Sequence, residues 1–285
     1  MSTAQNRIVR LPRIFVAATA LCSLVVAVVV ATPPQSAGAA ANPWPPVPVN
    51  GFSTPTGNGS WLALADGEVL MHGDAKAYGD ASGLSLQGPV VGGAAHPNGK
   101  GYWLVGSDGG IFTYGSARFY GSMGATHLNR AIFSMASTAD GRGYWMVAYD
   151  GGIFSFGDAR FFGSLGAVAL SQPINGITTT LSGNGYRMVA RDGGIFDFGD
   201  AKFYGSLGGR GFSDVIGMAR SPSGNGYWIA RANGSVYSFG DAKALGSAPT
   251  SLSNPVVTII ANPVTQGYLL VRADTSYAKF GKAPF

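Results

Sequence analysis

The sequence predicts an all-β protein assembled from copies of one unit. The stretch GYWLVGSDGGIFTYGSARFYGS at residues 101–122 returns as GYWMVAYDGGIFSFGDARFFGS at 143–164 and as GYRMVARDGGIFDFGDAKFYGS at 185–206. In each copy an Asp-Gly pair separates two short apolar runs, which is typical of a β-hairpin. Glycine makes up 44 of the 285 residues, about twice its ordinary usage, and no segment shows the apolar period of a helix. We therefore expect strands joined by tight turns throughout the repeated region.

Residues 1–39 have the features of a secretory signal peptide. A start that contains arginine but no acidic residue precedes the uncharged run IFVAATALCSLVVAVVVA at 14–31, and small residues follow up to Ala39 or Ala41, where cleavage fits. The run is also long enough to span a bilayer, so an uncleaved anchor is the alternative and would be the protein's one contact with a membrane. The sequence thus predicts an exported protein, extracellular or associated with the cell envelope, with a proline-rich linker at 40–47.

Removal of this segment changes the charge balance. The formal net charge of the whole chain is +5, and loss of Arg7, Arg10 and Arg13 reduces it to about +2. The repeats contain no basic stripe of the kind that binds nucleic acid. The one cysteine, Cys22, lies in the predicted signal peptide, so we expect a protein without disulfides whose stability comes from packing.

Six copies of the unit follow the linker. Aligned on the aromatic position of GYW, the copies are spaced by 41 or 42 residues, which indicates a solenoid, a propeller or a similar array. The aligned residues are Trp61, Trp103, Trp145, Arg187, Trp228 and Leu269. The predicted repeats cover about 48–88, 89–130, 131–172, 173–213, 214–254 and 255–285.

Each repeat is expected to form four short strands. A first strand such as PINGITTT at 173–180 precedes a turn rich in Pro, Gly and Asn, and the second strand has the sequence GYWLV at 101–105. The Asp-Gly pair suits a type I′ turn and leads into the third strand, GIF followed by aromatic residues. A second turn of the form GDA(K/R) leads into the fourth strand, which is FYGS at 119–122 in the second copy.

The predicted strands are apolar on both faces. In GYWLV at 101–105 successive side chains point to opposite faces, yet all the large ones are apolar, whereas a sheet with one wet face would alternate polar and apolar residues. A four-stranded sheet between two like neighbours is a blade of a β-propeller. We predict a six-bladed β-propeller, with two β-trefoils of three repeats each as the alternative. The last copy ends at Phe285 without a fourth strand, and residues 42–50 are expected to lie beside it.

The repeated unit, GYWLVA-x-DGGIF-x-FGDA-x-FYGS, resembles the repeats of exported actinobacterial proteins. Those repeats often accompany cell-wall hydrolase, amidase or esterase domains and are generally interpreted as propeller-like. The resemblance covers about residues 48–285 and is specific for the repeat rather than for an activity. Because no hydrolase-like segment accompanies the repeats here, the resemblance implies an accessory role at the cell wall.

The recurrent aspartates predict turns. One series occupies the hairpin, where the fifth copy has Asn233, which can replace aspartate in a turn but not in acid–base chemistry. This series is Asp66, Asp108, Asp150, Asp192 and Asp274. A second series, expected to accept backbone N–H groups in the second turn, is Asp74, Asp158, Asp200 and Asp241. A calcium site at either series is the alternative, but we predict no metal and no cofactor.

Recognisable catalytic motifs are missing from the sequence. It contains no HExxH, no G-x-S-x-G and no glycine-rich phosphate loop. The repeats contain one glutamate, Glu68, and three histidines without zinc-site spacing, His72, His96 and His127. We therefore favour a protein without catalytic activity. The enzymatic alternative is a lactonase-like propeller hydrolase or lyase with a metal at its central channel.

Two sets of residues are candidate ligand contacts. In the fourth copy Arg187 stands where other copies have Trp or Leu, and Arg191 precedes the hairpin aspartate. A charge among stacked aromatic rings needs a partner, and Asp197 in the next strand is the candidate. These charges either pair locally at the surface or form a polar ligand contact.

The second set places one cation beside an aromatic residue in most copies. Exposed aromatic rings stack on sugars and cations bind carboxylates or phosphates; the alternative is a solvated edge strand whose cations prevent aggregation. The candidates are Arg118, Tyr120, Arg160, Lys202 and Tyr204.

We therefore expect a secreted, monomeric, carbohydrate-binding protein. Its expected partner is a cell-wall or surface glycan or another envelope polymer. Scaffolding of envelope proteins is the other non-catalytic role, and nucleic acid is not an expected partner.

Overall fold

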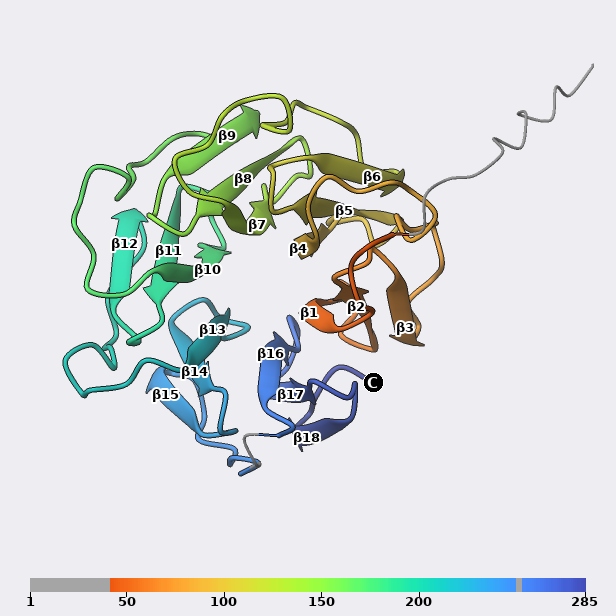
Figure 1. The fold of residues 1–285 in the computed structure, drawn as a ribbon. Coiled ribbons are helices and arrows are strands. Elements are labelled where there is room, and N and C mark those ends of the chain that lie inside the picture. Colours follow the sequence, from red (N-terminus) through yellow and green to blue (C-terminus); the bar gives the residue numbers. More distant parts are fainter. Residues whose placement is uncertain (1–41, 250–252) are drawn as a thin grey trace, which may run out of the picture. The chain divides into compact units, whose positions relative to one another are not determined.

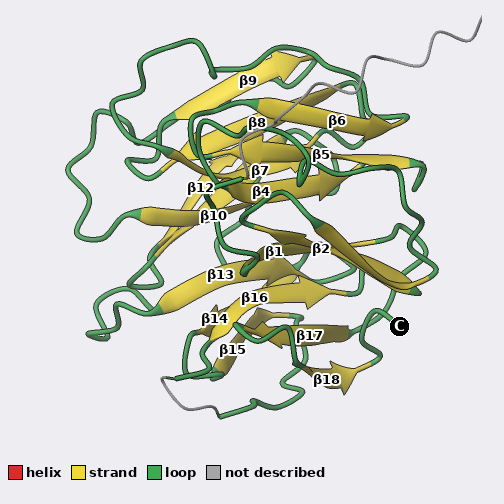
Figure 2. Ribbon diagram, turned by 45° about the vertical axis from the view of Figure 1, so that its right-hand side comes forward, coloured by secondary structure: helices red, strands yellow, loops and turns green. Residues whose placement is uncertain are grey.

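The computed structural model describes residues 42–249 and 253–285, so the predicted signal peptide lies outside the described residues. The described residues form eighteen strands in six antiparallel sheets of three strands each (Figures 1 and 2). They contain no helix, and hence none that could cross a membrane. The predicted all-β repeat fold is confirmed, and each sheet falls within one predicted repeat.

The strands follow the order of the repeats, and in each sheet the second strand lies between the other two. The first strands are β1 (Pro48–Ser53), β4 (Val90–Ala95), β7 (Ile132–Ser137), β10 (Ile174–Thr179), β13 (Val215–Arg220) and β16 (Val256–Ala261). The second strands are β2 (Gly59–Leu64), β5 (Gly101–Gly106), β8 (Gly143–Ala148), β11 (Gly185–Ala190), β14 (Gly226–Arg231) and β17 (Gly267–Arg272). The third strands are β3 (Val69–Gly73), β6 (Ile111–Gly115), β9 (Ile153–Gly157), β12 (Ile195–Gly199), β15 (Val236–Gly240) and β18 (Tyr277–Gly281).

The second strands are buried on both faces, as their sequence predicts. Every residue of β5 and of β8 is buried. Trp103 of β5 packs against Tyr144 of β8 with ring centroids 5.8 Å apart, and Trp145 packs against Tyr186 of β11 at the same distance. Since burial of one large apolar side chain contributes about 1.5–3 kcal/mol, these rings are a principal source of stability between neighbouring sheets.

The predicted hairpin between the second and third strands is confirmed, but the prediction that its turn is of type I′ is wrong. In the second repeat Gly109 has a φ of 82°, whereas Asp108 is not among the described non-glycine residues with positive φ. Gly109 donates its N–H to the carbonyl of Gly106, which fits a type I turn followed by a left-handed glycine. Asp108 stays in this conformation because its Oδ1 accepts the N–H of Gly110 at 3.0 Å.

The predicted fourth strand is not formed. In the second repeat the segment FYGS lies outside any strand ladder, and large side chains of two sheets satisfy its backbone instead. Trp103 Nε1 donates to the carbonyl of Arg118 at 2.7 Å. The Tyr144 hydroxyl, from the next sheet, accepts the N–H of Tyr120 at 3.1 Å and donates to the carbonyl of Gly121 at 2.6 Å. The prediction of four strands in each repeat is therefore wrong. Each sheet has three strands, and side chains hold the segment that was expected to form the fourth.

Neighbouring sheets also meet along their first strands. β1 contacts β4, and the same contact continues from one first strand to the next up to β16, which in turn contacts β1 (Figure 1). Between β1 and β16, the N–H of Gly51 donates to Thr258 Oγ1 at 3.3 Å and Ser53 Oγ donates to the carbonyl of Ala261. The last sheet thus contacts the first through side chains rather than through a strand ladder.

The expectation that residues 42–50 lie beside the last repeat is wrong for residues 42–47. Asn42 Nδ2 donates to the carbonyl of Asp66, and the carbonyl of Val47 accepts the N–H of Ala65 at 2.8 Å. Trp44 packs against the hydrophobic cluster of the first and second repeats. Consecutive prolines deprive this segment of N–H donors for a ladder, whereas its tryptophan can be buried against the first repeat.

Candidate functional site

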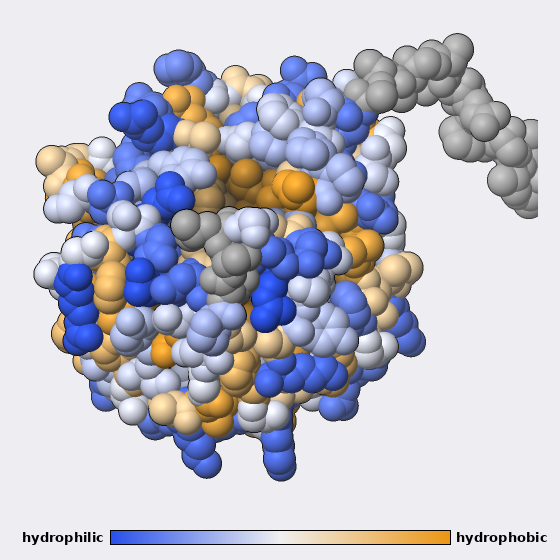
Figure 3. Space-filling model, turned by 60° about the horizontal axis from the view of Figure 1, so that its bottom comes forward, coloured by the Kyte–Doolittle hydropathy of each residue, from blue (hydrophilic) through white to orange (hydrophobic). Residues whose placement is uncertain are grey.

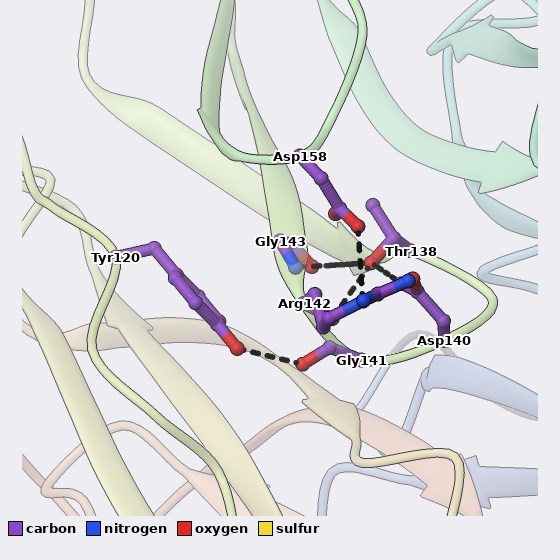
Figure 4. A network of polar contacts seen from close by, with 7 residues as sticks. All are labelled: Tyr120, Thr138, Asp140, Gly141, Arg142, Gly143 and Asp158. Carbon is purple, nitrogen blue, oxygen red and sulfur yellow. Dashed lines mark hydrogen bonds and ion pairs between the residues drawn. The ribbon is translucent and has the colours of Figure 1, made fainter.

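A surface pocket of about 770 Å³ lies between the second and third repeats. Its lining residues are His96, Ser116, Arg118, Tyr120, Asp140, Gly141, Arg142, Gly157 and Asp158. Two of the predicted ligand contacts, Arg118 and Tyr120, therefore lie in one pocket with Asp158 of the second-turn series and with Asp140 and Arg142, which the sequence did not single out. Figure 4 shows the third-repeat side chains meeting beside Thr138, and Tyr120 pointing its hydroxyl at the carbonyl of Gly141.

An arginine bridges the two carboxylates of this pocket. Arg142 Nε lies 2.7 Å from Asp140 Oδ2 and 3.6 Å from Asp158 Oδ2. Thr138 Oγ1 donates to Asp140 Oδ1 at 2.9 Å. The Arg142 side chain is 75% exposed, so water screens the pair and its contribution to stability is small. These groups remain accessible to a ligand.

The two carboxyl groups differ in acidity. The hydrogen bond from Arg142 lowers the pKa of Asp140. Burial, and then the neighbouring carboxyl of Asp140, raise the pKa of Asp158. The pair therefore loses its protons in two steps. When both are ionised, carboxylate oxygens lie beside guanidinium N–H groups, a set that can accept from and donate to hydroxyl groups.

The corresponding turns of three other repeats carry hydroxyl groups in place of the second carboxylate. Asp74 accepts from Thr54 and Thr56 at 2.8 and 2.6 Å, and Asp241 accepts from Ser221 at 2.7 Å and also from Ser223. Asp200 is bound by Thr180 and Ser182 in the same way. The main partners of this aspartate series are therefore hydroxyls of the preceding turn, rather than the backbone N–H groups that we expected. The third repeat differs from these three because it has a carboxylate, that of Asp140, where they have a second hydroxyl group.

Arg187 and Asp197 form the predicted ion pair, with Arg187 Nε 3.1 Å from Asp197 Oδ1. The pair is not at the surface, because Arg187 is only 1% exposed. Its Nη2 donates to the carbonyl of Lys202 at 3.0 Å, in place of the tryptophan Nε1 of other repeats. Its guanidinium lies 5.7 Å from the ring centre of Tyr204 and 5.0 Å from that of Tyr227. The structure thus brings the side chains of Arg187, Asp197 and Tyr204 together with the carbonyl of Lys202, but in an interior contact between the fourth and fifth sheets.

Arg191 does not join this cluster. It is exposed in the hairpin turn that follows β11, and its backbone N–H donates to the carbonyl of Pro173. Arg118, Arg160 and Lys202 are also exposed. Their carbonyls are fixed by the aromatic or arginine side chain of the second strand, so their side chains extend from an anchored backbone.

The exposed aromatic residues of the fourth segment are not the ones that the sequence singled out. Tyr120 and Tyr204 are half-buried and pack on tyrosines of the following sheet, at centroid distances of 5.9 and 5.8 Å. The residue before Tyr120, before Phe162 and before Tyr204 is a phenylalanine that is mostly exposed: Phe119 at 59%, Phe161 at 61% and Phe203 at 62%. The sequence signal was available, since a phenylalanine follows the cation in three consecutive copies.

The hairpin aspartates are structural. In all six repeats the side-chain oxygen at this position accepts the N–H of the residue two positions later, at 2.8–3.0 Å, and Asn233 does so as well as the aspartates. Within the described residues, no three His, Cys, Asp or Glu side chains gather into a group that could hold a metal ion.

The histidines have separate surroundings. His72 stacks on Phe285 with ring centroids 5.0 Å apart, and burial, followed by the charge of Lys279, lowers its pKa. His96 stacks on Trp103 at 5.3 Å, and His127 is exposed.

Comparison of the chain with known protein families finds no match. Comparison with curated proteins finds none either.

Proposed function

We propose that the protein is an exported, non-catalytic β-propeller of six blades that binds a glycan of the cell envelope through its rim. The ring is supported by the continuous series of contacts between first strands, in which β16 contacts β1 as well as β13. Each strand ladder lies within one repeat, which fits separate blades better than two barrels shared by three repeats each. The outer rim is then formed by the third strands and the segments that follow them.

The observation on which the glycan proposal depends is the exposure of Phe119, Phe161 and Phe203. Each is about three-fifths exposed and directly follows an exposed arginine or lysine. A large exposed apolar side chain that recurs at one position in three consecutive repeats marks an interaction surface. Aromatic rings stack on the apolar faces of sugars, and the adjacent cations suit carboxylate or phosphate substituents.

The spacing of these phenylalanines favours a polymer. Three similar weak sites on one rigid body bind a polymer with repeated units far more tightly than any one site, because later contacts are intramolecular. The pocket beside Arg118 supplies hydrogen-bonding groups for sugar hydroxyls, namely the carboxylates of Asp140 and Asp158 and the guanidinium of Arg142. Arg118 lines this pocket and the exposed Phe119 is the next residue along the chain, which supports a surface that combines ring stacking with hydrogen bonds to sugar hydroxyls.

Retention of the purified protein on cell-wall polysaccharide, peptidoglycan and lipid vesicles tests this function. The informative variant changes Phe119, Phe161 and Phe203 together to Ala. Alanine is the natural residue at the matching positions of the first and fifth repeats, Ala77 and Ala244, so the fold should tolerate it. We expect at least tenfold weaker retention of the triple variant and intermediate losses for single changes.

A Val168→Ala variant is the matched control, because Val168 is 52% exposed but lies outside the FYGS segments. Its retention should equal that of the wild type. Equal retention of the triple variant, or no retention of folded wild-type protein on any glycan, would contradict the proposal. Release of sugar fragments during incubation would contradict the non-catalytic part, and capture of envelope proteins alone would favour scaffolding.

A further inference from the structure

The first strands of the sheets line a hollow of about 550 Å³ that is distinct from the surface pocket. A β-bulge near the start of each first strand adds a residue to the wall of this hollow. The bulge residues are Val49, Val91, Phe133, Asn175, Ile216 and Val257. Figure 3 shows hydrophobic residues, in orange, gathered in a hollow of the molecule. Five of the six bulge residues are aliphatic or aromatic, and hydroxyl, amide and backbone polar groups line the hollow between them.

One charged residue, Arg220 at the end of β13, is found among the described residues that line this hollow. At the same position the other first strands have small, uncharged residues. These are Ser53, Ala95, Ser137, Thr179 and Ala261. Since five sheets form with small side chains here, the fold itself does not require an arginine at this position.

Arg220 has no carboxylate partner. It takes part in none of the ion pairs found among the described residues. Its Nη1 has no solvent-accessible surface and no hydrogen-bond partner. A partly buried guanidinium without a counter-charge is unfavourable, because a buried charge must be paired or hydrogen-bonded to offset its desolvation.

A second arginine, Arg187, lies close enough to Arg220 to affect its charge. Arg220 is in register with Tyr227 of β14, and the Arg187 guanidinium lies 5.0 Å from the centre of that same ring. Asp197 is paired with Arg187 at 3.1 Å. Burial, and then the positive charge of Arg187, lower the pKa of Arg220. Arg187 has Asp197 as its partner, whereas Arg220 has none among the ion pairs of the described residues, so one positive charge at the wall of the hollow is uncompensated.

We propose that the hollow binds a small monocarboxylic acid whose carboxylate pairs with Arg220 and whose apolar body lies against the first strands. One uncompensated cation suits a singly charged anion. A guanidinium group forms charge-assisted hydrogen bonds with a carboxylate. The hollow lies within the range of about 300–1,000 Å³ that small-molecule sites occupy. The apolar side chains at five of the six bulge positions give a hydrocarbon body a surface to lie against, and none of the residues that line the hollow belongs to the proposed glycan surface.

Titration calorimetry of the purified full-length protein with benzoate and with hexanoate tests this inference. Benzamide and hexanamide are the neutral controls, since they keep the shape but lack the charge. We expect millimolar or tighter binding of at least one of the two acids and at least tenfold weaker binding of its amide. Arg220→Ala should weaken binding of that acid at least tenfold. Arg210→Ala, which removes an exposed arginine outside the hollow, should leave it unchanged.

Thermal unfolding without ligand provides a second readout. Because Arg220→Ala removes an unpaired charge and installs the residue of the second and sixth sheets, the variant should melt at the same temperature as the wild type or higher. The acid should raise the melting temperature of the wild type and not that of the variant. Failure of both acids to bind folded wild-type protein, equal binding by Arg220→Ala, or a clear loss of stability in that variant would each overturn the inference. None of these results depends on glycan retention.

Discussion

The Tyr144 hydroxyl fixes the FYGS segment of the second repeat, and its removal tests how neighbouring repeats are joined. The hydroxyl donates to the carbonyl of Gly121 at 2.6 Å and accepts the N–H of Tyr120 at 3.1 Å. The ring itself is fully buried against Trp103. In Tyr144→Phe the ring packing is retained and the two hydrogen bonds across the interface are lost, so the variant isolates the polar part of the contact.

The expected loss follows from the two backbone groups left without a partner. An unsatisfied buried donor or acceptor costs about 1–3 kcal/mol. Both groups lie in a surface segment where water can replace part of the lost bonding, so we expect the lower end for each and about 2 kcal/mol in total. For a protein of this size each kcal/mol shifts the melting temperature by about 2–4 °C, which gives a decrease of about 4–8 °C.

Urea unfolding followed by circular dichroism measures this loss. The matched control is Tyr277→Phe, because the Tyr277 ring is 41% exposed in the last sheet. We expect a change within about 0.5 kcal/mol for the control. A Tyr144→Phe variant as stable as the control would show that the FYGS segment is held by other contacts, and would refute the account of why it forms no ladder.

Three further results are expected from the structure. Burial raises the pKa of Tyr114 and of Tyr268 to about 12, so the folded state keeps protons that the unfolded chain loses near pH 10. The stability that comes from these protonated tyrosines is fully present below pH 10 and is lost as the pH rises toward about 12. The tyrosinate absorbance of these rings should therefore appear together with unfolding. Titration of every tyrosine near pH 10 in the folded protein would contradict this. Thr275 has a φ of 68° at a position where the other repeats have glycine. Because glycine adopts this left-handed conformation without strain, Thr275→Gly should raise the free energy of unfolding by about 1 kcal/mol. A less stable variant would argue against backbone strain there. Asp150→Asn and Asn233→Asp should each change stability by less than about 0.5 kcal/mol, because amide and carboxylate oxygens make the same turn bond; a larger loss in thermal unfolding would reveal a role for the charge.

The features of the fold that depend on local periodicity could be predicted from the sequence. The apolar run of the second strands predicts burial on both faces, and the Asp-Gly pair predicts the hairpin. The turn type could not be predicted, since it depends on whether Asp108 adopts positive φ, and the bond from Gly110 to its carboxylate stabilises the alternative. The fourth strand was predicted wrongly because the partners of that segment, such as Tyr144, come from the next repeat about 24 residues away.

The candidate site was predictable where one repeat departs visibly from the others. Arg187 stands out in an aligned column of tryptophans, and its pairing with Asp197 follows from their positions on adjacent strands. Arg220 also differs from its equivalents, which are small residues in the other five first strands. The first strands vary so much in sequence that this difference could not be recognised before the structure aligned them. The pocket residue Asp140 could not be identified, since its meeting with Asp158 depends on how two separate turns approach each other.

Each strand ladder is completed within a single repeat, and the C-terminal residues Ala283 and Phe285 pack against the first sheet near Leu62 and Leu64. The position at which the chain begins is therefore not dictated by its hydrogen bonding. A circularly permuted chain, opened between any two repeats and joined by a short linker from its present end to Asn42, keeps all of its hairpins. The same independence lets whole repeats be duplicated or exchanged during evolution without breaking a sheet.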